Sequence, residues 1–506
     1  MLPSAGNCRG CRLREREIQR LQQALDRLHQ DVDRLERRCA KLKNANRQLR
    51  QELDEAHRKT HRQAHPFRRR CRKKRCKKPG RPKGHPADLR PTPTPAQIDR
   101  VIDVPIRLCP ECQVELVEPK ISVQFQTDLP PIVPIVTQFN IESGWCPCCQ
   151  QRWQGRHAEQ TSNASGAAGN TLGPGVLTMA AELKHRLGVP YRKICDFLET
   201  YCGLHAAPAT FIRAEQRLAD LAQPTYDLLL DALRRAKIVH ADETGWRVGR
   251  LNAWLWVFSN KDVTVYAIRA GQGARGHEVP AEILGPDFDG FLIIDGFKAY
   301  DVLNYAKGQC NGHLLRRAKE MSEAAEPREQ QKLQTLIALI QEAINLAERR
   351  EQLSVAGYHR RATTIEKRFD DWLLHIARCQ PSPELDRLAN HIANHYDEWL
   401  LFLREPLVPP TNNHAERMLR PAVITRKIGG CNKTLRGALV HSILASLMVT
   451  WHQRGQKFVD LARQLWESGE PQAIPLPPIR TPPGEGANAR KPPGKKGNNK
   501  ANLNRA

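Results

Sequence analysis

The chain has 506 residues, and at about 150 residues per domain this length predicts roughly three folded units. Its net charge of +25 at pH 7 and its pI of about 9.7 favour a protein that contacts nucleic acid, because each neutralised phosphate releases counterions. The sequence has no apolar run of about 18 residues, becomes charged soon after its start and has an odd number of cysteines, 15. These features argue against a membrane span, a signal peptide and a disulfide framework, so we expect a soluble protein of the cell interior.

Residues 1–60 carry a heptad pattern. Apolar residues recur at alternating spacings of three and four, at Ile18, Leu21, Leu25, Leu28, Val32, Leu35, Cys39, Leu42, Leu49 and Leu53. A seam of this length is typical of a coiled coil, in which the polar Asn46 at an a position would set register and strand number. We predict a coiled coil that forms a homodimer or a higher oligomer; an amphipathic helix packed on its own domain is the alternative. Like charges at Asp31 and Glu36 would repel in a parallel homodimer, so the strand direction stays open.

Residues 61–100 form a basic linker. Between Phe67 and Lys83, eleven of seventeen residues are basic and none is acidic. The Gly-Arg-Pro core around Arg81 resembles an AT-hook, which lays arginine along a narrow minor groove. Arg81 and Lys83 are therefore candidate contacts to double-stranded DNA; a solvated basic linker is the alternative. The Pro-Thr repeat at residues 91–95 is typical of a stiff spacer.

Residues 101–160 contain two CxxC pairs with a strand-like stretch between them. The pairs are Cys109 with Cys112 and Cys146 with Cys149. Four thiolates complete the tetrahedron that Zn²⁺ prefers, and two such pairs are typical of a zinc ribbon. We predict a structural Zn²⁺ at these four cysteines, with Cys148 as the alternative to Cys149.

Residues 161–236 are predicted to be helical after a short polar linker. Helical periodicity covers residues 176–187, 191–201 and 210–221. Short helices joined by a Gly-containing turn are typical of a helix-turn-helix, which would bind DNA. An ordinary helical hairpin that packs on the following domain is the alternative.

Residues 237–455 alternate between strand and helix patterns and predict an α/β unit with a mixed sheet. Strands are expected over residues 238–248, 253–260, 263–270 and 291–294, and helices over 276–284 and 298–305. Residues 321–400 have helical patterns only and are predicted to be an insertion. Residues 456–506 hold a C-terminal helix and a tail poor in apolar residues, which we expect to be disordered from about residue 471.

Three acidic residues stand at the ends of elements in this α/β unit. Asp242 lies in its first strand, Asp295 directly follows its last, and Glu416 lies in a helix that two asparagines could cap. Carboxylates from two strand ends and one helix could converge on Mg²⁺ or Mn²⁺, which prefer hard oxygen ligands. Pairs of such ions serve phosphoryl transfer, so the three acids are the candidate catalytic residues.

Each acid also has a simpler interpretation. Asp295 could be a turn former before a glycine, and Glu416 could pair with Arg420 four positions along a helix. Asp242 and Glu243 are adjacent, so in a strand their side chains point to opposite faces and only one can join the cluster. The residues alone leave that choice open.

Basic residues surround the third acid. Arg417, Arg420, Arg426 and Lys427 follow it along the same predicted helix. Guanidinium groups beside a metal cluster suit the positioning of DNA phosphates, so these four are candidate DNA contacts. A solvated basic face is the alternative.

Four motifs together resemble one family. HADETGW, LIIDGFKAY, QCNGHLLRR and NNHAERMLRPAVITRK are similar to the motifs of the insertion-sequence-66-type transposases, over roughly residues 15–455. The resemblance implies a DDE enzyme with a ribonuclease-H-like core that cuts and joins DNA with Mg²⁺. It assigns the two aspartates to Asp242 and Asp295 and the glutamate to Glu416. Cys310 and His313 fall on the family's C-x-x-H position, and Phe297 stands where the family often has tyrosine.

The resemblance further implies a bacterial, cytoplasmic and nucleoid-associated protein. Its partners would be double-stranded DNA, both at the ends of a mobile element and at the target, and accessory proteins encoded by the same element. Two other functions fit parts of the pattern. A metal-dependent nuclease would share the three acids without joining DNA, and a zinc-containing DNA-binding regulator would use them structurally.

Overall fold

The computed structural model describes residues 90–118 and 120–479, together with Ile18, Leu21, Gln22, Leu25, His29 and Val32. These six N-terminal residues are helical and exposed, including the four that belong to the heptad pattern. The rest of the predicted coiled coil, the basic segment with Arg81 and Lys83, and residues 480–506 lie outside the described residues. The chain divides into two compact units, residues 1–126 and 127–506.

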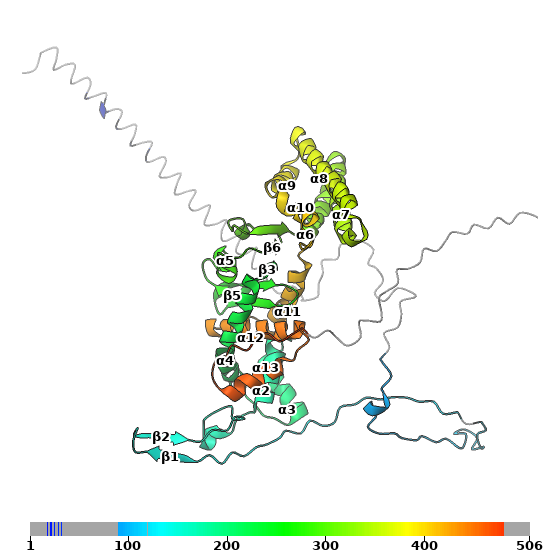
Figure 1. Ribbon diagram of the computed structural model, residues 1–506, viewed down its shortest axis with the longest axis vertical. Coiled ribbons are helices and arrows are strands. Elements are labelled where there is room, and N and C mark those ends of the chain that lie inside the picture. Colours follow the sequence, from blue (N-terminus) through cyan, green and yellow to red (C-terminus); the bar gives the residue numbers. More distant parts are fainter. Residues whose placement is uncertain are drawn as a thin grey trace, which may run out of the picture. The chain divides into compact units, whose positions relative to one another are not determined.

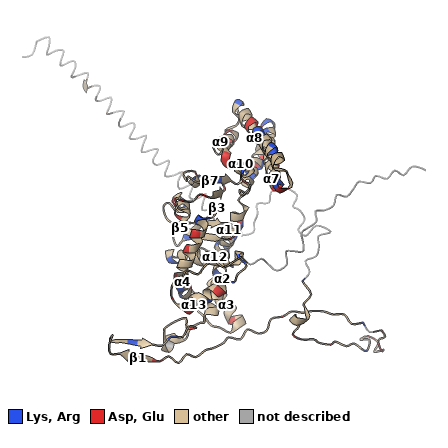
Figure 2. Ribbon diagram, in the orientation of Figure 1, with Lys and Arg blue, Asp and Glu red and all other residues tan. Residues whose placement is uncertain are grey.

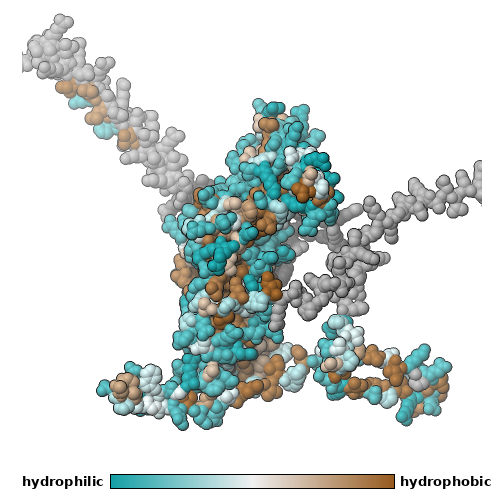
Figure 3. All heavy atoms as spheres, in the orientation of Figure 1, coloured by the Kyte–Doolittle hydropathy of each residue, from teal (hydrophilic) through white to brown (hydrophobic). Residues whose placement is uncertain are grey.

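The described residues of the first unit are mostly extended. A short 3-10 helix, η1 (Pro95–Gln97), is followed by an isolated bridge between Leu108 and Glu115. Apolar side chains along this segment are exposed, among them Val104 at 87% and Ile121 at 96%, and they show as brown patches along the thin extended stretch in Figure 3.

The second unit is built on a mixed sheet of five strands. They are β3 (Ile238–Val248), β4 (Leu251–Ser259), β5 (Thr264–Ala270), β6 (Phe291–Ile294) and β7 (Ala306–Gln309). Their order is β5-β4-β3-β6-β7. The pairs β5–β4 and β4–β3 are antiparallel, and the pairs β3–β6 and β6–β7 are parallel. This mixed sheet, flanked by helices (Figure 1), fits a ribonuclease-H-like core. A separate two-stranded hairpin, β1 (Ser143–Cys146) and β2 (Gln151–Gln154), precedes it.

Helices cover both faces of the sheet. They are α2 (Pro174–His185), α3 (Tyr191–Cys202), α4 (Pro208–Arg234), α5 (Glu278–Leu284), α11 (Asn413–Gly429), α12 (Leu435–Gln453) and α13 (Phe458–Ser468). In one hydrophobic cluster, residues of β3 such as Val239 and Ala241 pack against the helices α2, α3, α4, α5, α12 and α13. A second cluster joins α11 and α12 to Trp246 and Val248. Alternate residues of β3 therefore face different helices, as a pleated strand requires.

The helical region before the sheet shares its core. The long helix α4 has 27 residues and packs with α2 and α3 into the same cluster as the strands. This packing agrees with the alternative of a helical hairpin on the following domain, and DNA binding by the helical region of residues 161–236 stays a prediction.

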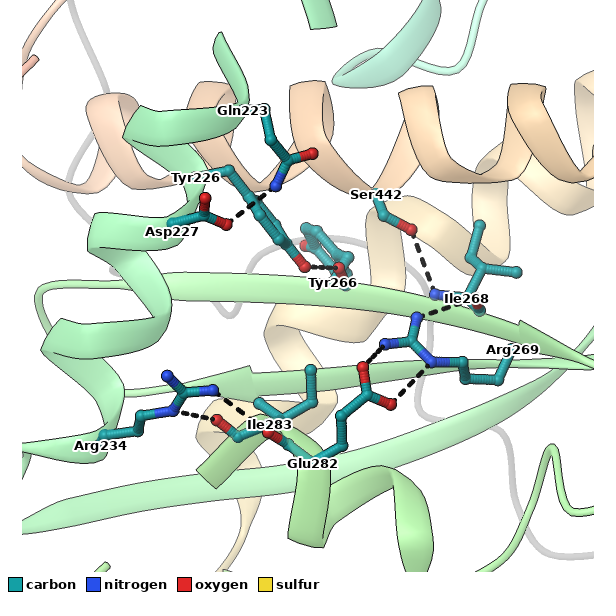
Figure 4. Close-up of polar contacts among 10 residues, drawn as sticks. All are labelled: Gln223, Tyr226, Asp227, Arg234, Tyr266, Ile268, Arg269, Glu282, Ile283 and Ser442. Atoms are coloured by element: carbon teal, nitrogen blue, oxygen red, sulfur yellow. Dashed lines mark hydrogen bonds and ion pairs between the residues drawn. The ribbon is translucent and has the colours of Figure 1, made fainter. Parts of the chain in front are cut away.

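The edge strand β5 is sealed by α12. Alternate backbone N–H groups of β5 donate to α12 hydroxyls four residues apart: Thr264 to Thr450 at 3.0 Å, Tyr266 to Ser446 at 2.8 Å, and Ile268 to Ser442 at 3.1 Å. The last of these contacts is drawn in Figure 4, where Tyr226 of α4 also donates to the Tyr266 carbonyl. We call this series the hydroxyl ladder. It satisfies donors that an open sheet edge would leave unpaired.

The stretch between β7 and α11 is wholly helical, as expected. It comprises α6 (Asn311–Ala324), α7 (Pro327–Glu348), α8 (Val355–Arg378), α9 (Pro383–Asn394) and α10 (Tyr396–Arg404). These helices enclose a hydrophobic cluster of their own, which reaches Ile293 of β6. Their surfaces carry both charges, with basic and acidic residues on α7 and α8 (Figure 2).

Two local predictions were wrong. Residues 298–305, expected as a helix, form only the 3-10 helix η3 (Lys298–Tyr300), and the strand β7 that follows was not predicted. The tail was expected to be disordered from about residue 471, but residues up to 479 are bonded to the core. Gln472 donates its N–H to the Leu221 carbonyl at 3.1 Å, and Ile474 donates to Thr225 at 3.0 Å. Apolar Ile474 also packs on the main cluster, which is enough to hold an otherwise irregular segment. None of the described helices combines the length and the apolar character needed to cross a membrane.

Candidate active site

Asp242 lies in the middle of β3, on the face toward α11. The expectation of a strand end was wrong, because β3 continues to Val248 as the partner of β4. The neighbours of Asp242 at even positions show the direction of its side chain, because His240 bonds Asn412 and Trp246 packs with α11. One carboxylate oxygen of Asp242 accepts the N–H of Glu243 at 2.8 Å. The side chain is half-buried, so its charge is only partly hydrated.

Asp295 directly follows β6, the parallel neighbour of β3. Its carboxylate accepts the N–H of Phe297 at 3.1 Å, which closes a tight turn. The turn requires the glycine between them, because Gly296 has a φ of +89° and a Cβ there would lie 3.0 Å from Gln309 Oε1.

Glu416 lies in the first turn of α11, which Asn412 ties to β3. The Asn412 side chain is fully buried, donates to the Ala241 carbonyl at 2.7 Å and lies 2.9 Å from His240 Nδ1. Since the amide nitrogen is used on Ala241, its oxygen accepts, so His240 carries its proton on Nδ1. Burial lowers the pKa of His240 to about 4, so the ring is neutral at pH 7.

The three acids interact electrostatically. Burial, together with the carboxylates of Asp295, Glu243 and Glu416, raises the pKa of Asp242 to about 7. Among the described residues, no Lys, Arg or His lies within ion-pair distance of Asp242 or Asp295, and Glu416 has only His313, at 3.7 Å. Such a set of uncompensated hard oxygen donors fits a divalent cation.

The acids are near one another without forming a finished metal site. Within the described part of the chain, no three His, Cys, Asp or Glu side chains stand at ligand spacing. Mutual repulsion of carboxylates that share no cation favours separated rotamers, so side-chain rotation would be needed to gather the oxygens around an ion.

Cys310 and His313 lie behind the third acid, at the start of α6. The N–H of Asn412 donates to Cys310 Sγ at 3.1 Å. Burial raises the pKa of the Cys310 thiol, but hydrogen bonds from His313 and Asn412 outweigh burial and the net change is a lower pKa. The hydrogen bond with Cys310 raises the pKa of His313 in turn, against the effect of burial. The pair therefore supports the positions of Asn412 and Glu416 rather than standing apart from the site.

The four predicted basic contacts differ in their surroundings. Arg417, Arg420 and Lys427 are exposed on α11. Arg426 is half-buried and bonds β3 instead, through Thr244 Oγ1 at 2.9 Å and the Gly245 carbonyl. The exposed three are free to meet a phosphate, whereas Arg426 joins α11 to the strand that carries Asp242.

Sequence reasoning missed Arg275. It lies in the loop after β5 and bonds Glu243, whose side chain points away from Asp242 and is only 1% exposed. Burial raises the pKa of Glu243 to about 7, although hydrogen bonds from Arg275 lower it. No sequence motif indicates a role for this arginine, because the residues that contact it are far apart in the sequence: they lie in β3, in β4 and in the turn after β6.

The two CxxC pairs form matching turns, one in each unit. In both, the residue after the second cysteine has a positive φ: 59° at Gln113 and 51° at Gln150. Hydrogen bonds from the backbone of Cys112 and Glu111 lower the pKa of Cys109, and those of Cys149 and Cys148 lower the pKa of Cys146. Backbone donors that favour a thiolate suit a metal-binding turn.

A family model now decides the family. The model of the Transposase IS66 family matches residues 169–439, more than half of the chain. The chain belongs to the Transposase IS66 family. The match includes the five strands, the helical insertion and all three acids, and it confirms the resemblance of the motifs. Membership in the Transposase IS66 family supports a transposase function. No curated protein matches the chain.

Proposed function

We propose that this chain is a metal-dependent DNA transposase that uses Asp242, Asp295 and Glu416 to cut and join DNA strands. The observation that supports the proposal most is the electrostatic coupling of these three acids, brought from β3, β6 and α11 without a cationic partner for the two aspartates among the described residues. A transposase family whose core holds such a set of oxygen donors fits phosphoryl transfer.

The residues of the chain supply position and charge for this reaction. The three carboxylates would hold Mg²⁺ or Mn²⁺, which when bound supplies an activated oxygen nucleophile and stabilises the leaving oxygen. Asn412 fixes the helix that carries Glu416, and exposed Arg417, Arg420 and Lys427 would position DNA phosphates beside the acids. Water would first cut a strand and leave a 3′-hydroxyl, which would then attack target DNA in the same site.

The other modules would bring the DNA to this site. The proposed contacts to double-stranded DNA at the element ends are Arg81 and Lys83 in the basic linker, the zinc module and the helical region of residues 161–236. The heptad segment is proposed to form a homodimer or a higher oligomer, and accessory proteins of the same element could join the complex. Four of its apolar residues, Ile18, Leu21, Leu25 and Val32, are exposed and helical, as an unpaired coiled-coil seam would be.

Single substitutions of the three acids test the proposal. Asp242→Asn, Asp295→Asn and Glu416→Gln keep the shape of each side chain but remove its charge, so each should reduce Mg²⁺-dependent cleavage and joining of element ends at least about 100-fold. DNA binding, measured by gel shift, should be retained because the proposed DNA-binding modules are unchanged. Glu282→Gln is the matched control, since the exposed Glu282 carboxylate pairs with Arg269 and with no other described residue.

The outcomes separate the three functions. Cleavage without joining by the unmodified chain would indicate a nuclease. Binding without metal-dependent cleavage would indicate a regulator. Full activity of the Asp295→Asn protein would show that the trio is wrong.

A further inference from the structure

An ion pair between a buried carboxylate and a partly exposed guanidinium lies on the opposite face of β3 from Asp242. Arg275 donates from Nε and Nη2 to Glu243 Oε1, at 3.1 and 2.8 Å. The Glu243 side chain is 1% exposed, whereas that of Arg275 is 42% exposed. Arg275 thus compensates a carboxylate that is buried on its own strand face.

The Arg275 guanidinium is held between two aromatic rings. Its central carbon lies 4.0 Å from the centre of the Trp254 ring and 3.8 Å from the centre of the Phe297 ring. Trp254 belongs to β4 and is the register partner of Gly245 in β3. A planar guanidinium stacked in this way has a fixed orientation as well as a fixed place.

Phe297 connects this pair to the second acid. Its ring stacks on Arg275, and its own N–H donates to the Asp295 carboxylate at 3.1 Å. Asp295 itself lies outside the strands, in a turn whose next residue, Gly296, has a φ of +89°. The orientation of the Asp295 carboxylate therefore depends on where Phe297 is held.

We propose that Glu243 and Arg275 are positioning residues, which clamp the Phe297 ring and so set the Asp295 carboxylate for its metal ion. The inference rests on the proposed function, because it assumes that Asp295 is a metal ligand. It assigns to Glu243, the neighbour of Asp242, a task different from metal binding.

Metal binding by the purified full-length chain tests the clamp. The probe is Mn²⁺, whose free concentration is followed by electron paramagnetic resonance, with thermal unfolding measured on each variant. Arg275→Gln and Phe297→Leu should weaken Mn²⁺ binding about 10-fold, as loss of an outer partner of a ligand does. Arg275→Lys should behave like Arg275→Gln, because an ammonium neither stacks flat nor forms the two-nitrogen contact. Phe297→Tyr keeps the ring and should bind Mn²⁺ like the unmodified chain.

The matched control is Arg269→Gln. Arg269 and Glu282 also form a two-nitrogen guanidinium–carboxylate pair, at 3.2 and 2.6 Å, but this pair joins β5 to α5 (Figure 4). Its loss should leave Mn²⁺ binding unchanged. If Arg275→Gln is unfolded, the Mn²⁺ affinities of Phe297→Leu and Phe297→Tyr test the proposal instead.

Several results would overturn the clamp. These are unchanged Mn²⁺ binding in folded Arg275→Gln and Phe297→Leu, full restoration by Arg275→Lys, or Mn²⁺ bound by Asp295→Asn as tightly as by the unmodified chain. Failure of the proposed function looks different: the unmodified chain would bind Mn²⁺ with the expected variant pattern but neither cut nor join DNA.

Discussion

Asn412 is a single side chain on which the position of the third acid depends. It was expected only as a helix cap, but its side chain makes no cap bond and instead joins α11 to His240 and the Ala241 carbonyl of β3. Its backbone carbonyl accepts the N–H of Glu416 at 3.3 Å, so the acid lies one helical turn beyond this anchor.

Substitution of Asn412 should affect both stability and activity. Asn412→Ala leaves the Ala241 carbonyl and the His240 ring without partners, so the free energy of unfolding should fall by about 1–3 kcal/mol. Strand cleavage should fall as well, because Glu416 loses its anchor. Urea denaturation and a cleavage assay measure the two effects. Asn390→Ala is the control, since the exposed Asn390 side chain donates to Asp386 of the same helix, α9. Equal stability of the two variants would contradict the anchoring role.

Asp242 and Glu243 should make stability depend on pH in an unusual direction. Both carboxyl groups have pKa values raised to about 7 in the folded chain, against ordinary values of about 4. The folded chain therefore holds more protons than the unfolded chain between about pH 4 and pH 7, and the free energy of unfolding contributed by these groups falls as the pH rises through that window.

Divalent metal should reverse this loss. Mg²⁺ binds the ionised carboxylates, so the increase in Tm on adding Mg²⁺ should be larger at pH 8 than at pH 5.5. Asp242→Asn removes one of the two titrating groups and one proposed ligand, so it should remove most of the difference. Differential scanning calorimetry at the two pH values makes the comparison. The same increase in Tm at both pH values would argue against ionised carboxylates as the ligands.

At the scale of elements, the paired turns of the cysteine region are the most regular local feature. Both read Cys-Pro-x-Cys-Gln and both end on a glutamine of positive φ. Between them the segment has exposed apolar side chains, such as Val136 at 92%, and no described strand before β1. Bringing four thiolates to one Zn²⁺ would close this segment and give its apolar residues a place to pack.

We expect about one Zn²⁺ per purified chain, measured by mass spectrometry of the metal content. Replacing both Cys109 and Cys112 with serine should abolish it. The choice at the second turn is testable too. Trp153 donates to Cys149 Sγ at 3.4 Å, and the Cys149 backbone gives the largest hydrogen-bond effect on Cys146. Cys149→Ser should therefore lose zinc and Cys148→Ser should keep it. Undiminished zinc in the Cys109 and Cys112 double variant would refute the site.

Helices and strands with a strong hydrophobic periodicity could be predicted from the sequence. Elements that form only because a neighbouring element pairs or packs with them could not. The strands β3, β4 and β5 lie close to their predicted ranges, because each contains several apolar residues that the core buries. β7 contains Lys307, Gly308 and Gln309, which have little strand propensity, and it is a strand because β6 offers it a parallel edge. α12 is buried on nearly all sides, since it touches the sheet edge, α4 and α11 at once.

At the scale of the whole molecule, the residues of the candidate site also divide into those that a local sequence pattern indicates and those that only tertiary contacts reveal. Asp242, Asp295 and Glu416 could be proposed from the sequence because each stands in a family motif that a single stretch of sequence contains. Arg275 could not be found because its role arises from the register of β3 and β4 and from the turn after β6, which no single stretch of sequence encodes. Arg426 differs in the other direction. The basic pattern of its helix predicted a DNA contact, but in the structure its guanidinium donates to Thr244 of β3.

The hydroxyl ladder has a consequence for how the chain must be synthesised. α12 is translated long after β5, so on the ribosome the N–H groups of Thr264, Tyr266 and Ile268 have no hydroxyl partners until most of the chain has emerged. A product that ends before Leu435 never acquires them and keeps an open, apolar strand edge, which recruits other chains. Premature stops in this gene should therefore yield aggregated fragments rather than soluble DNA-binding proteins that lack the third acid.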